Sequence, residues 1–91
     1  MLVTLEEMKT YLRVDFDDDD SILSAFIESA QALCMDIARI EDADDFAIVA
    51  NSRIAVMYAV AYLYEHREKA NHHELTLTLR ALLFGSRKEV F

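Results

Sequence analysis

The stretch that decides the fold is FAIVANSRIAVMYAVAYLY, residues 46–64, because it is apolar on nearly every side when wound as a helix. The first side carries Phe46, Val49, Met57, Val60 and Tyr64, the second Ile48, Ala55, Val56, Ala59 and Leu63, and the third Ile54, Tyr58, Ala61 and Tyr62. A helix that is apolar all round has to be buried all round. Three short neighbours from the same chain cannot cover it, so the sequence indicates that a second copy covers the rest.

The composition of the whole chain predicts an all-α fold. The 91 residues include no proline and a single glycine, whereas all-β folds and Gly-rich phosphate loops need such turn residues. A chain of this length is expected to form one domain, residues 1–91. Its hydrophobic fraction is 54%, which is high for so small a chain and again suggests apolar surface committed to partners or to self-assembly.

Hydrophobic periodicity predicts a small four-helix bundle-like domain in which the long apolar helix is the third. Thr4 and Glu7 have the spacing of a capping box and predict the first helix start. Asp44 or Asp45 is expected to cap the third helix. The expected helices cover residues 5–12, 18–39, 45–69 and 75–84, followed by a short C-terminal tail, residues 85–91.

An acidic run lies in YLRVDFDDDDSIL, residues 11–23, and consists of Asp15, Asp17, Asp18, Asp19 and Asp20. An EF-hand loop starting at Asp15 would need glycine at the sixth position and glutamate at the twelfth. Asp20 and Phe26 stand there instead, which disfavours a calcium site. One or two aspartates would suffice to start the second helix. The surplus is either a solvated acidic surface or an electrostatic feature of an assembly, such as a channel wall that repels DNA.

The remaining chemistry-bearing residues favour neither an enzyme nor a metal protein. The net charge of −8 argues against tight binding of DNA or RNA, which requires clustered Lys and Arg. His66, His72 and His73 lack a zinc-ligand pattern. Cys34, the single cysteine, lies on an apolar stripe and is expected to be a small buried residue. No cofactor is expected.

Two further expectations concern location and contacts. Arg53 lies inside the apolar stretch 46–64, so we interpret this stretch as a buried helix rather than a membrane span, and we expect no membrane partner. Tyrosine and arginine are enriched at protein interfaces. The candidate interface residues are therefore Arg53, Tyr58, Tyr62, Tyr64, Arg67, Arg80 and Arg87.

Three passages together resemble the head–tail connector (adaptor) proteins of tailed phages and prophages, often labelled DNA-packaging proteins. TLEEMKTYLRVDFDDDDSILSAFIESA, residues 4–30, resembles the family's short helix, acidic run and long amphipathic helix. RIAVMYAVAYLYEHRE, residues 53–68, is similar to its apolar third helix, and LTLTLRALLFGSRKEVF, residues 75–91, to its closing segment. The connector before the third helix lacks the expected Gly or Pro, as does the segment before the last helix.

The resemblance implies a structural virion protein and not an enzyme. Such proteins are helical bundles that assemble in the bacterial host cytoplasm into a ring, expected to be a dodecamer, at the head–tail junction. The ring sits beneath the portal protein, extends the DNA channel and receives the next head-completion or tail protein, while DNA passes without specific binding. The alternative is a small acidic helical adaptor or regulator that binds a host or phage protein.

Overall fold

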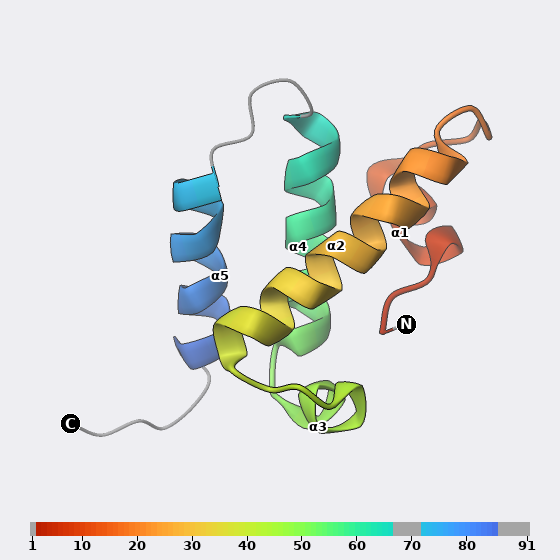
Figure 1. Ribbon diagram of the computed structural model, residues 1–91. Coiled ribbons are helices and arrows are strands. Elements are labelled where there is room, and N and C mark those ends of the chain that lie inside the picture. The colour runs from red at the N-terminus through yellow and green to blue at the C-terminus, as the bar shows by residue number, and fades with distance from the viewer. Residues whose placement is uncertain (1, 67–71, 86–91) are drawn as a thin grey trace.

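Five α-helices pack as one bundle in the part of the chain that the structure describes (Figure 1). The computed structural model describes residues 2–66 and 72–85, and in this part of the chain all regular structure is helical. The prediction of an all-α, bundle-like domain is therefore confirmed. The helices are α1 (Leu5–Leu12), α2 (Asp20–Ala38), α3 (Ala43–Ile48), α4 (Ser52–Glu65) and α5 (His72–Gly85).

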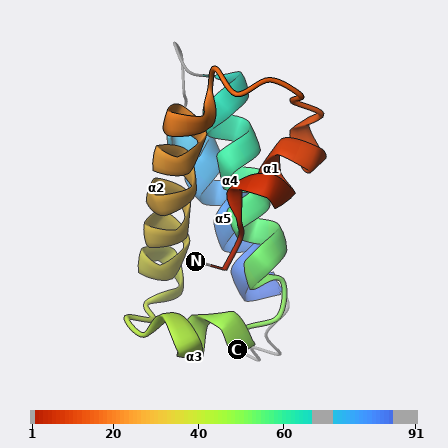
Figure 2. The same ribbon diagram turned by 90° about the vertical axis from the view of Figure 1, so that its right-hand side faces the viewer.

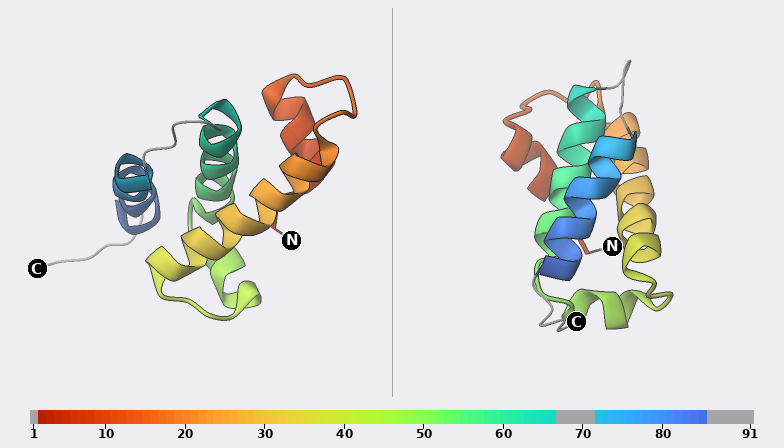
Figure 3. Two further views of the ribbon diagram at one scale, coloured as in Figure 1. Left: turned by 45° about the horizontal axis from the view of Figure 1, so that its top comes forward. Right: turned by 90° about the vertical axis from the view of Figure 1, so that its left-hand side faces the viewer.

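The centre of the bundle is α4, which packs most extensively against α2 and then against α5. Figures 1 and 3 show α2 crossing one face of α4, with α5 on one side and α1 on the other. Small residues let the backbones of α2 and α4 approach closely. The core contains Val3, Met8, Leu23, Ile27, Ala30, Cys34, Ala38, Phe46, Ala55, Val56, Ala59, Val60, Leu75, Leu79 and Leu83.

The prediction of one long third helix over residues 45–69 is wrong, because the segment is broken into α3 and α4. Val49 has an extended backbone, and Asn51 takes the left-handed conformation with φ 66°. Asparagine tolerates this conformation better than most residues. The break lets α3 turn across the end of the bundle, as Figure 2 shows, so that Phe46 becomes buried.

Other helix boundaries also differ from those expected. The cap of α3 is Asp42, whose carboxylate accepts a hydrogen bond from the Asp44 N–H at 3.0 Å, and neither Asp44 nor Asp45 is the cap. The second helix begins at Asp20 rather than at residue 18, and it ends at Ala38, one residue before the expected end. The last helix begins at His72, three residues earlier than expected.

The first two helices end on arginine in the left-handed conformation, Arg13 with φ 60° and Arg39 with φ 59°. After α2, the Arg39 N–H donates to the Asp36 carbonyl and the Ile40 N–H donates to the Met35 carbonyl. These are the two bonds of a Schellman motif, where glycine is the usual residue. Because arginine rather than glycine stands at both positions, the sequence did not indicate that the helices end there.

Within the described residues, α2 is the one helix long and apolar enough to cross a membrane by length and composition. This is weak evidence, because the core helix of a soluble protein passes the same test. The side of α2 that carries Leu23, Ile27, Ala30, Cys34 and Ala38 is buried in the bundle. The stretch 46–64 forms no single span, since α4 has 14 residues.

Candidate assembly surfaces

The acidic run is tied to α1 through one lysine. Lys9 Nζ lies 2.7 Å from Asp17 Oδ1 and 2.9 Å from Asp20 Oδ1. Its side chain is 17% exposed, while that of Asp17 is 86% exposed. Hydrogen bonds to Asp17 and Asp20 raise the pKa of Lys9 above its ordinary value. The same contact with Lys9 lowers the pKa of Asp17.

A second contact joins the acidic run to α4. The Tyr64 hydroxyl donates a hydrogen bond of 2.8 Å to Asp19 Oδ2, across 45 positions of sequence. The side chain of Asp19 makes no capping hydrogen bond to the start of α2, although its position is that of the cap. Asp17, Asp19 and Asp20 therefore contact side chains of α1 and α4. Asp15 and Asp18 are the exposed members of the run without an ion pair among the described residues.

Arg53 also has a partner inside the chain. Its guanidinium forms an ion pair with Glu7 and contacts Met57 Sδ at 3.7 Å. Glu7 and Thr4 form the reciprocal capping box of α1, in which Glu7 Oε1 accepts from the Thr4 N–H and Thr4 Oγ1 accepts from the Glu7 N–H. Arg53 thus binds α4 to the first turn of α1. It remains half-exposed, so its proposed interface role stays a prediction.

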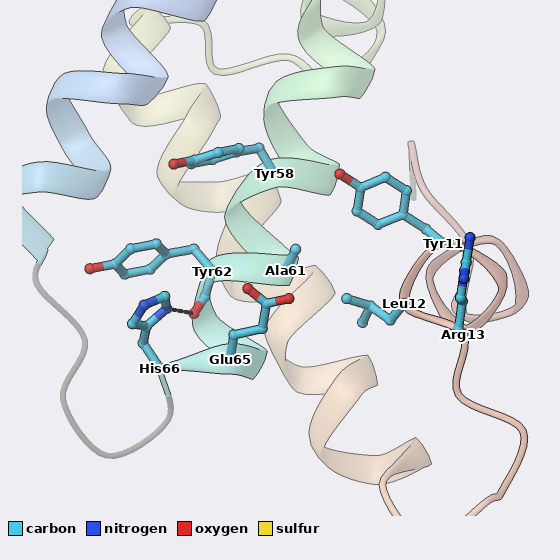
Figure 4. A pocket seen from close by; sticks show the side chains of 8 residues that line it. All are labelled: Tyr11, Leu12, Arg13, Tyr58, Ala61, Tyr62, Glu65 and His66. Atoms are coloured by element: carbon cyan, nitrogen blue, oxygen red, sulfur yellow. Dashed lines mark hydrogen bonds between the residues drawn. The ribbon is translucent and has the colours of Figure 1, made fainter.

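A groove of about 430 Å³ lies between α1 and the outer side of α4. Figure 4 shows Tyr58 and Tyr62 on one side, Tyr11 and Leu12 on the other, and Ala61 between them. The small Ala61 side chain leaves the space that the larger side chains enclose. Its remaining lining residues are Arg13, Glu65 and His66, and the His66 ring stacks on Tyr62 with 4.2 Å between ring centroids.

The outer side of α4 continues beyond the groove as a stripe that is apolar except for Glu65 at its end. Ile54, Tyr58, Ala61 and Glu65 follow one another at helical spacing on the side opposite the buried residues of this helix. The exposed fractions are 56% for Ile54 and 37% for Tyr58. Ile54, Tyr58 and Ala61 belong to the third side of the apolar stretch, which we expect from the sequence to be covered in part by a second copy. We call Ile54, Tyr58, Ala61 and Glu65 the outer stripe.

The other candidate interface residues lie apart from the groove. Arg80 is exposed on α5, where it lines a separate hollow of about 610 Å³ at the end of α2. Residues of both charge signs line that hollow, including Arg39, Asp36 and Glu41. The structure thus brings Tyr58 and Tyr62 together but not Arg80. Arg67, Arg87, residues 86–91 of the tail and the expected helix end at residue 69 lie outside the described residues.

Of the groove residues, only Tyr58 and Tyr62 were among the interface residues predicted from the sequence. The predicted set did not include Tyr11, Leu12, Arg13, Ala61, Glu65 and His66. Tyr11 had a visible signal, since it adjoins the apolar face of the first helix while the stretch 46–64 needs cover. No feature of the sequence indicated Arg13, because the left-handed turn at the end of α1 places its side chain at the groove. Lys9 was also missed, although it is the one cation within the first helix and precedes the acidic run.

Cys34 and the acidic residues form no metal-binding cluster in the described ranges, 2–66 and 72–85. Cys34 is fully buried, as predicted, and burial raises the pKa of its thiol to about 12. A thiol held neutral in this way is a poor nucleophile. Among these residues, no group of three or more His, Cys, Asp and Glu side chains is placed to hold a metal ion.

An all-helical domain with large apolar residues exposed on one side of a central helix is typical of proteins that assemble with other proteins. The family model for phage gp6-like head-tail connector protein matches residues 2–90 of this chain. The chain therefore belongs to that family, which confirms the resemblance found in the sequence. No curated protein and no solved structure in the comparisons matches the chain significantly.

Membership of this family gives the coarse function. The protein is a structural phage connector, and its place is the junction between head and tail of the virion. Assembly with phage head and tail proteins, and oligomerisation, follow from the same membership.

Proposed function

We propose that this protein assembles as a ring beneath the portal protein and extends the DNA channel during head completion. The ring, a dodecamer in this proposal, forms in the host cytoplasm before or during its attachment to the head. One rim contacts the portal, and the other receives the next head-completion or tail protein. The chain contributes shape and surface rather than catalysis.

The observation that carries this proposal is the outer stripe of α4. Ile54 and Tyr58 are large and apolar, yet they lie on the surface of a domain whose core is already complete without them. An isolated small domain gains nothing from exposing such residues together, whereas contiguous apolar surface is typical of protein interfaces. A stripe that the chain itself leaves uncovered supports a partner subunit at this position.

The charge distribution supports passage of DNA through the ring. Each chain has a net charge of −8, so a ring multiplies the negative charge around its channel. Exposed Asp15 and Asp18 are the members of the acidic run that face solvent without an ion pair in the described residues. A negative wall repels the phosphate backbone and lets DNA slide. In this proposal these two aspartates line the channel, while Asp17, Asp19 and Asp20 have a structural role.

Electron microscopy of the purified protein, alone and mixed with portal protein, tests the proposal. The expected result is a closed ring with a central channel in at least one of the two samples. The variant Asp15→Asn/Asp18→Asn should still form rings but package or eject DNA less efficiently. Particles without rings in both samples would contradict the proposed ring, and unchanged packaging and ejection would contradict the channel role of these aspartates.

The groove between α1 and α4 favours a second candidate function, an adaptor that binds a segment of another phage or host protein. A groove of about 430 Å³ with three tyrosines has the aromatic lining that peptide-binding sites use. This adaptor would be a monomer or dimer in solution and in the virion. The two functions therefore differ in subunit number, which the same microscopy measures.

A further inference from the structure

We propose that the groove between α1 and α4 receives the outer edge of α5 from the next copy of the chain, with Leu77 over Ala61 and Arg80 beside Glu65. This inference rests on the proposed ring and names the two surfaces that close it. The contact is head-to-tail, so each copy uses its groove toward one neighbour and its α5 edge toward the other. Repetition of such a contact closes a ring when the rotation between copies permits.

The groove offers an apolar centre with charges at its margin. Tyr58 and Tyr62 lie on one side of Ala61 and Tyr11 on the other, and the lining also includes Glu65 and Arg13 (Figure 4). Neither Glu65 nor Arg13 forms an ion pair with another described residue. The groove is therefore suited to an apolar side chain that is followed by a cation on the Glu65 side.

The outer edge of α5 has this chemistry. Leu75, Leu79 and Leu83 form the buried stripe of the helix, and Leu77 lies nearly opposite them. Leu77 is 51% exposed, although nothing in the packing of its own chain requires an apolar residue there. Arg80 follows three residues later, and it too is exposed and forms no ion pair among the described residues.

Charge complementarity selects α5 over the other exposed apolar residues. Arg80 lies one turn after Leu77 and matches Glu65 in charge. Phe16, by contrast, lies inside the acidic run and would bring several aspartates toward Glu65. Ile48 on α3 is followed by no cation among its neighbours in sequence.

The position of the two surfaces suits a ring. Figures 1 and 3 show α5 at one edge of the bundle and α1 at the other, with α4 between them. Because the groove and the α5 edge lie on opposite edges of a subunit, they cannot contact each other within one chain. For the same reason, a two-fold dimer cannot form both groove–edge contacts at the same time. Each copy therefore leaves one groove and one edge free until the series closes on itself.

Disulfide trapping tests the contact directly. Tyr58→Cys and Leu77→Cys are made as separate proteins, mixed in equal amounts and oxidised, and the covalent dimers are counted by mass. Cys34 does not interfere, because it is buried and its thiol pKa is raised to about 12. Ser29→Cys, at an exposed position of α2, is the matched control. It is mixed with Tyr58→Cys and, separately, with Leu77→Cys.

The expected result is a dimer of Tyr58→Cys with Leu77→Cys that forms roughly tenfold faster than either homodimer, because a bound neighbour raises the effective concentration of the second thiol. A chain with both cysteines should give a ladder of covalent multimers. Equal rates for all pairs, or faster pairing with Ser29→Cys, would overturn the assignment. The covalent link forms between two thiols, and the added oxidant accepts their two electrons and two protons.

Charge exchange provides a second test with folded proteins, because Glu65 and Arg80 are exposed. Glu65→Arg and Arg80→Glu should each weaken self-association severalfold, and the double variant should recover most of the loss. If the losses of self-association in the two single variants simply add in the double variant, Glu65 and Arg80 do not contact each other between copies.

The outcomes separate this inference from the proposed ring. Rings in the microscope with no preference for the Tyr58–Leu77 pair would overturn the surfaces named here and leave the ring standing. If no rings form and no cysteine pair is trapped faster than the others, both the proposed ring and the proposed contact are wrong.

Discussion

The two sides of α4 are both apolar, yet they have different roles. The inner side carries Ala55, Val56, Ala59 and Val60, which are fully buried against α2 and α5. The outer side carries Ile54 and Tyr58, which are larger and remain partly exposed. Small residues on the inner side permit close approach of helices within the chain, whereas the larger ones on the outer side provide contact area for another molecule. Side-chain size, more than hydrophobicity, distinguishes the two.

The largest expected difference between the sides comes from placing one charge on each. Val60→Asp buries an unpaired carboxylate at a site with no exposure, which costs several kcal/mol, against a total stability of roughly 5–15 kcal/mol for a domain. We expect this variant to be unfolded or nearly so, as measured by far-ultraviolet circular dichroism. Tyr58→Asp is the matched control and should stay folded while losing self-association. A folded Val60→Asp would contradict the assignment of the inner side to the core.

A second pair extends the comparison to α3, where inward and outward residues lie two positions apart. Phe46 is 1% exposed and Ile48 is 82% exposed. We expect Phe46→Ala to lower the free energy of unfolding by about 3–5 kcal/mol, because it leaves a cavity under α3. Ile48→Ala should change it by less than about 0.5 kcal/mol. Urea denaturation of both variants measures these values, and equal losses would show that α3 does not seal the core through Phe46.

A smaller effect is expected at the flank of α4, where Tyr64 contacts Asp19. Tyr64→Phe removes one hydroxyl whose bond to the carboxylate is 2.8 Å long and partly buried. We expect a loss of about 1.5–3 kcal/mol in the free energy of unfolding, since a hydrogen bond to a charged group contributes more than a neutral one. Asp19→Asn, which keeps an acceptor oxygen, should cost less. A larger loss in Asp19→Asn than in Tyr64→Phe would mean that Asp19 matters through other contacts.

The smallest effect is expected from the exposed pair of Lys9 and Asp17. Because the pKa of Asp17 is lowered in the folded protein, the pair stabilises above the ordinary aspartate value of 3.8 and is lost as the pH falls through the folded pKa. Because the pKa of Lys9 is raised, the same stabilisation is present below 10.5 and is lost as the pH rises through the folded pKa. Melting temperatures across pH should show weaker dependence at both ends in Lys9→Gln, and identical profiles would exclude a role for the pair.

The sequence predicted the elements that depend on periodicity and capping. The buried stripe of α2 and the all-helical class were visible because apolar residues recur at helical spacing, and Thr4 with Glu7 indicated the start of α1. The sequence also placed Ile54 and Tyr58 on one helical face and indicated that part of this helix lacks cover, although the structure was needed to show that this face is the exposed one. These features depend on local order along the chain.

What the sequence did not predict depends on backbone turns and on long-range pairs. The helix ends at Arg13 and Arg39 use the left-handed conformation without glycine, so no residue type marked them. The break at Asn51 uses a residue that favours this conformation, but the apolar pattern around it indicated a continuous helix. The partners of the acidic run, Lys9 and Tyr64, come from other helices, and only the folded chain brings them together. For the same reason the sequence did not predict the groove, which is lined by residues of α1 and α4 that are far apart in the chain.

The measurement that tests the central claim most directly is the mass of the protein in solution, by light scattering on a sizing column over a range of concentrations. The wild-type chain, alone or mixed with portal protein, should give one discrete large mass, and Tyr58→Asp should be a monomer with an unchanged melting temperature. A wild-type chain that stays monomeric at every concentration in both samples would contradict the claim that a second copy covers the outer stripe of α4. So would a Tyr58→Asp variant with the wild-type mass.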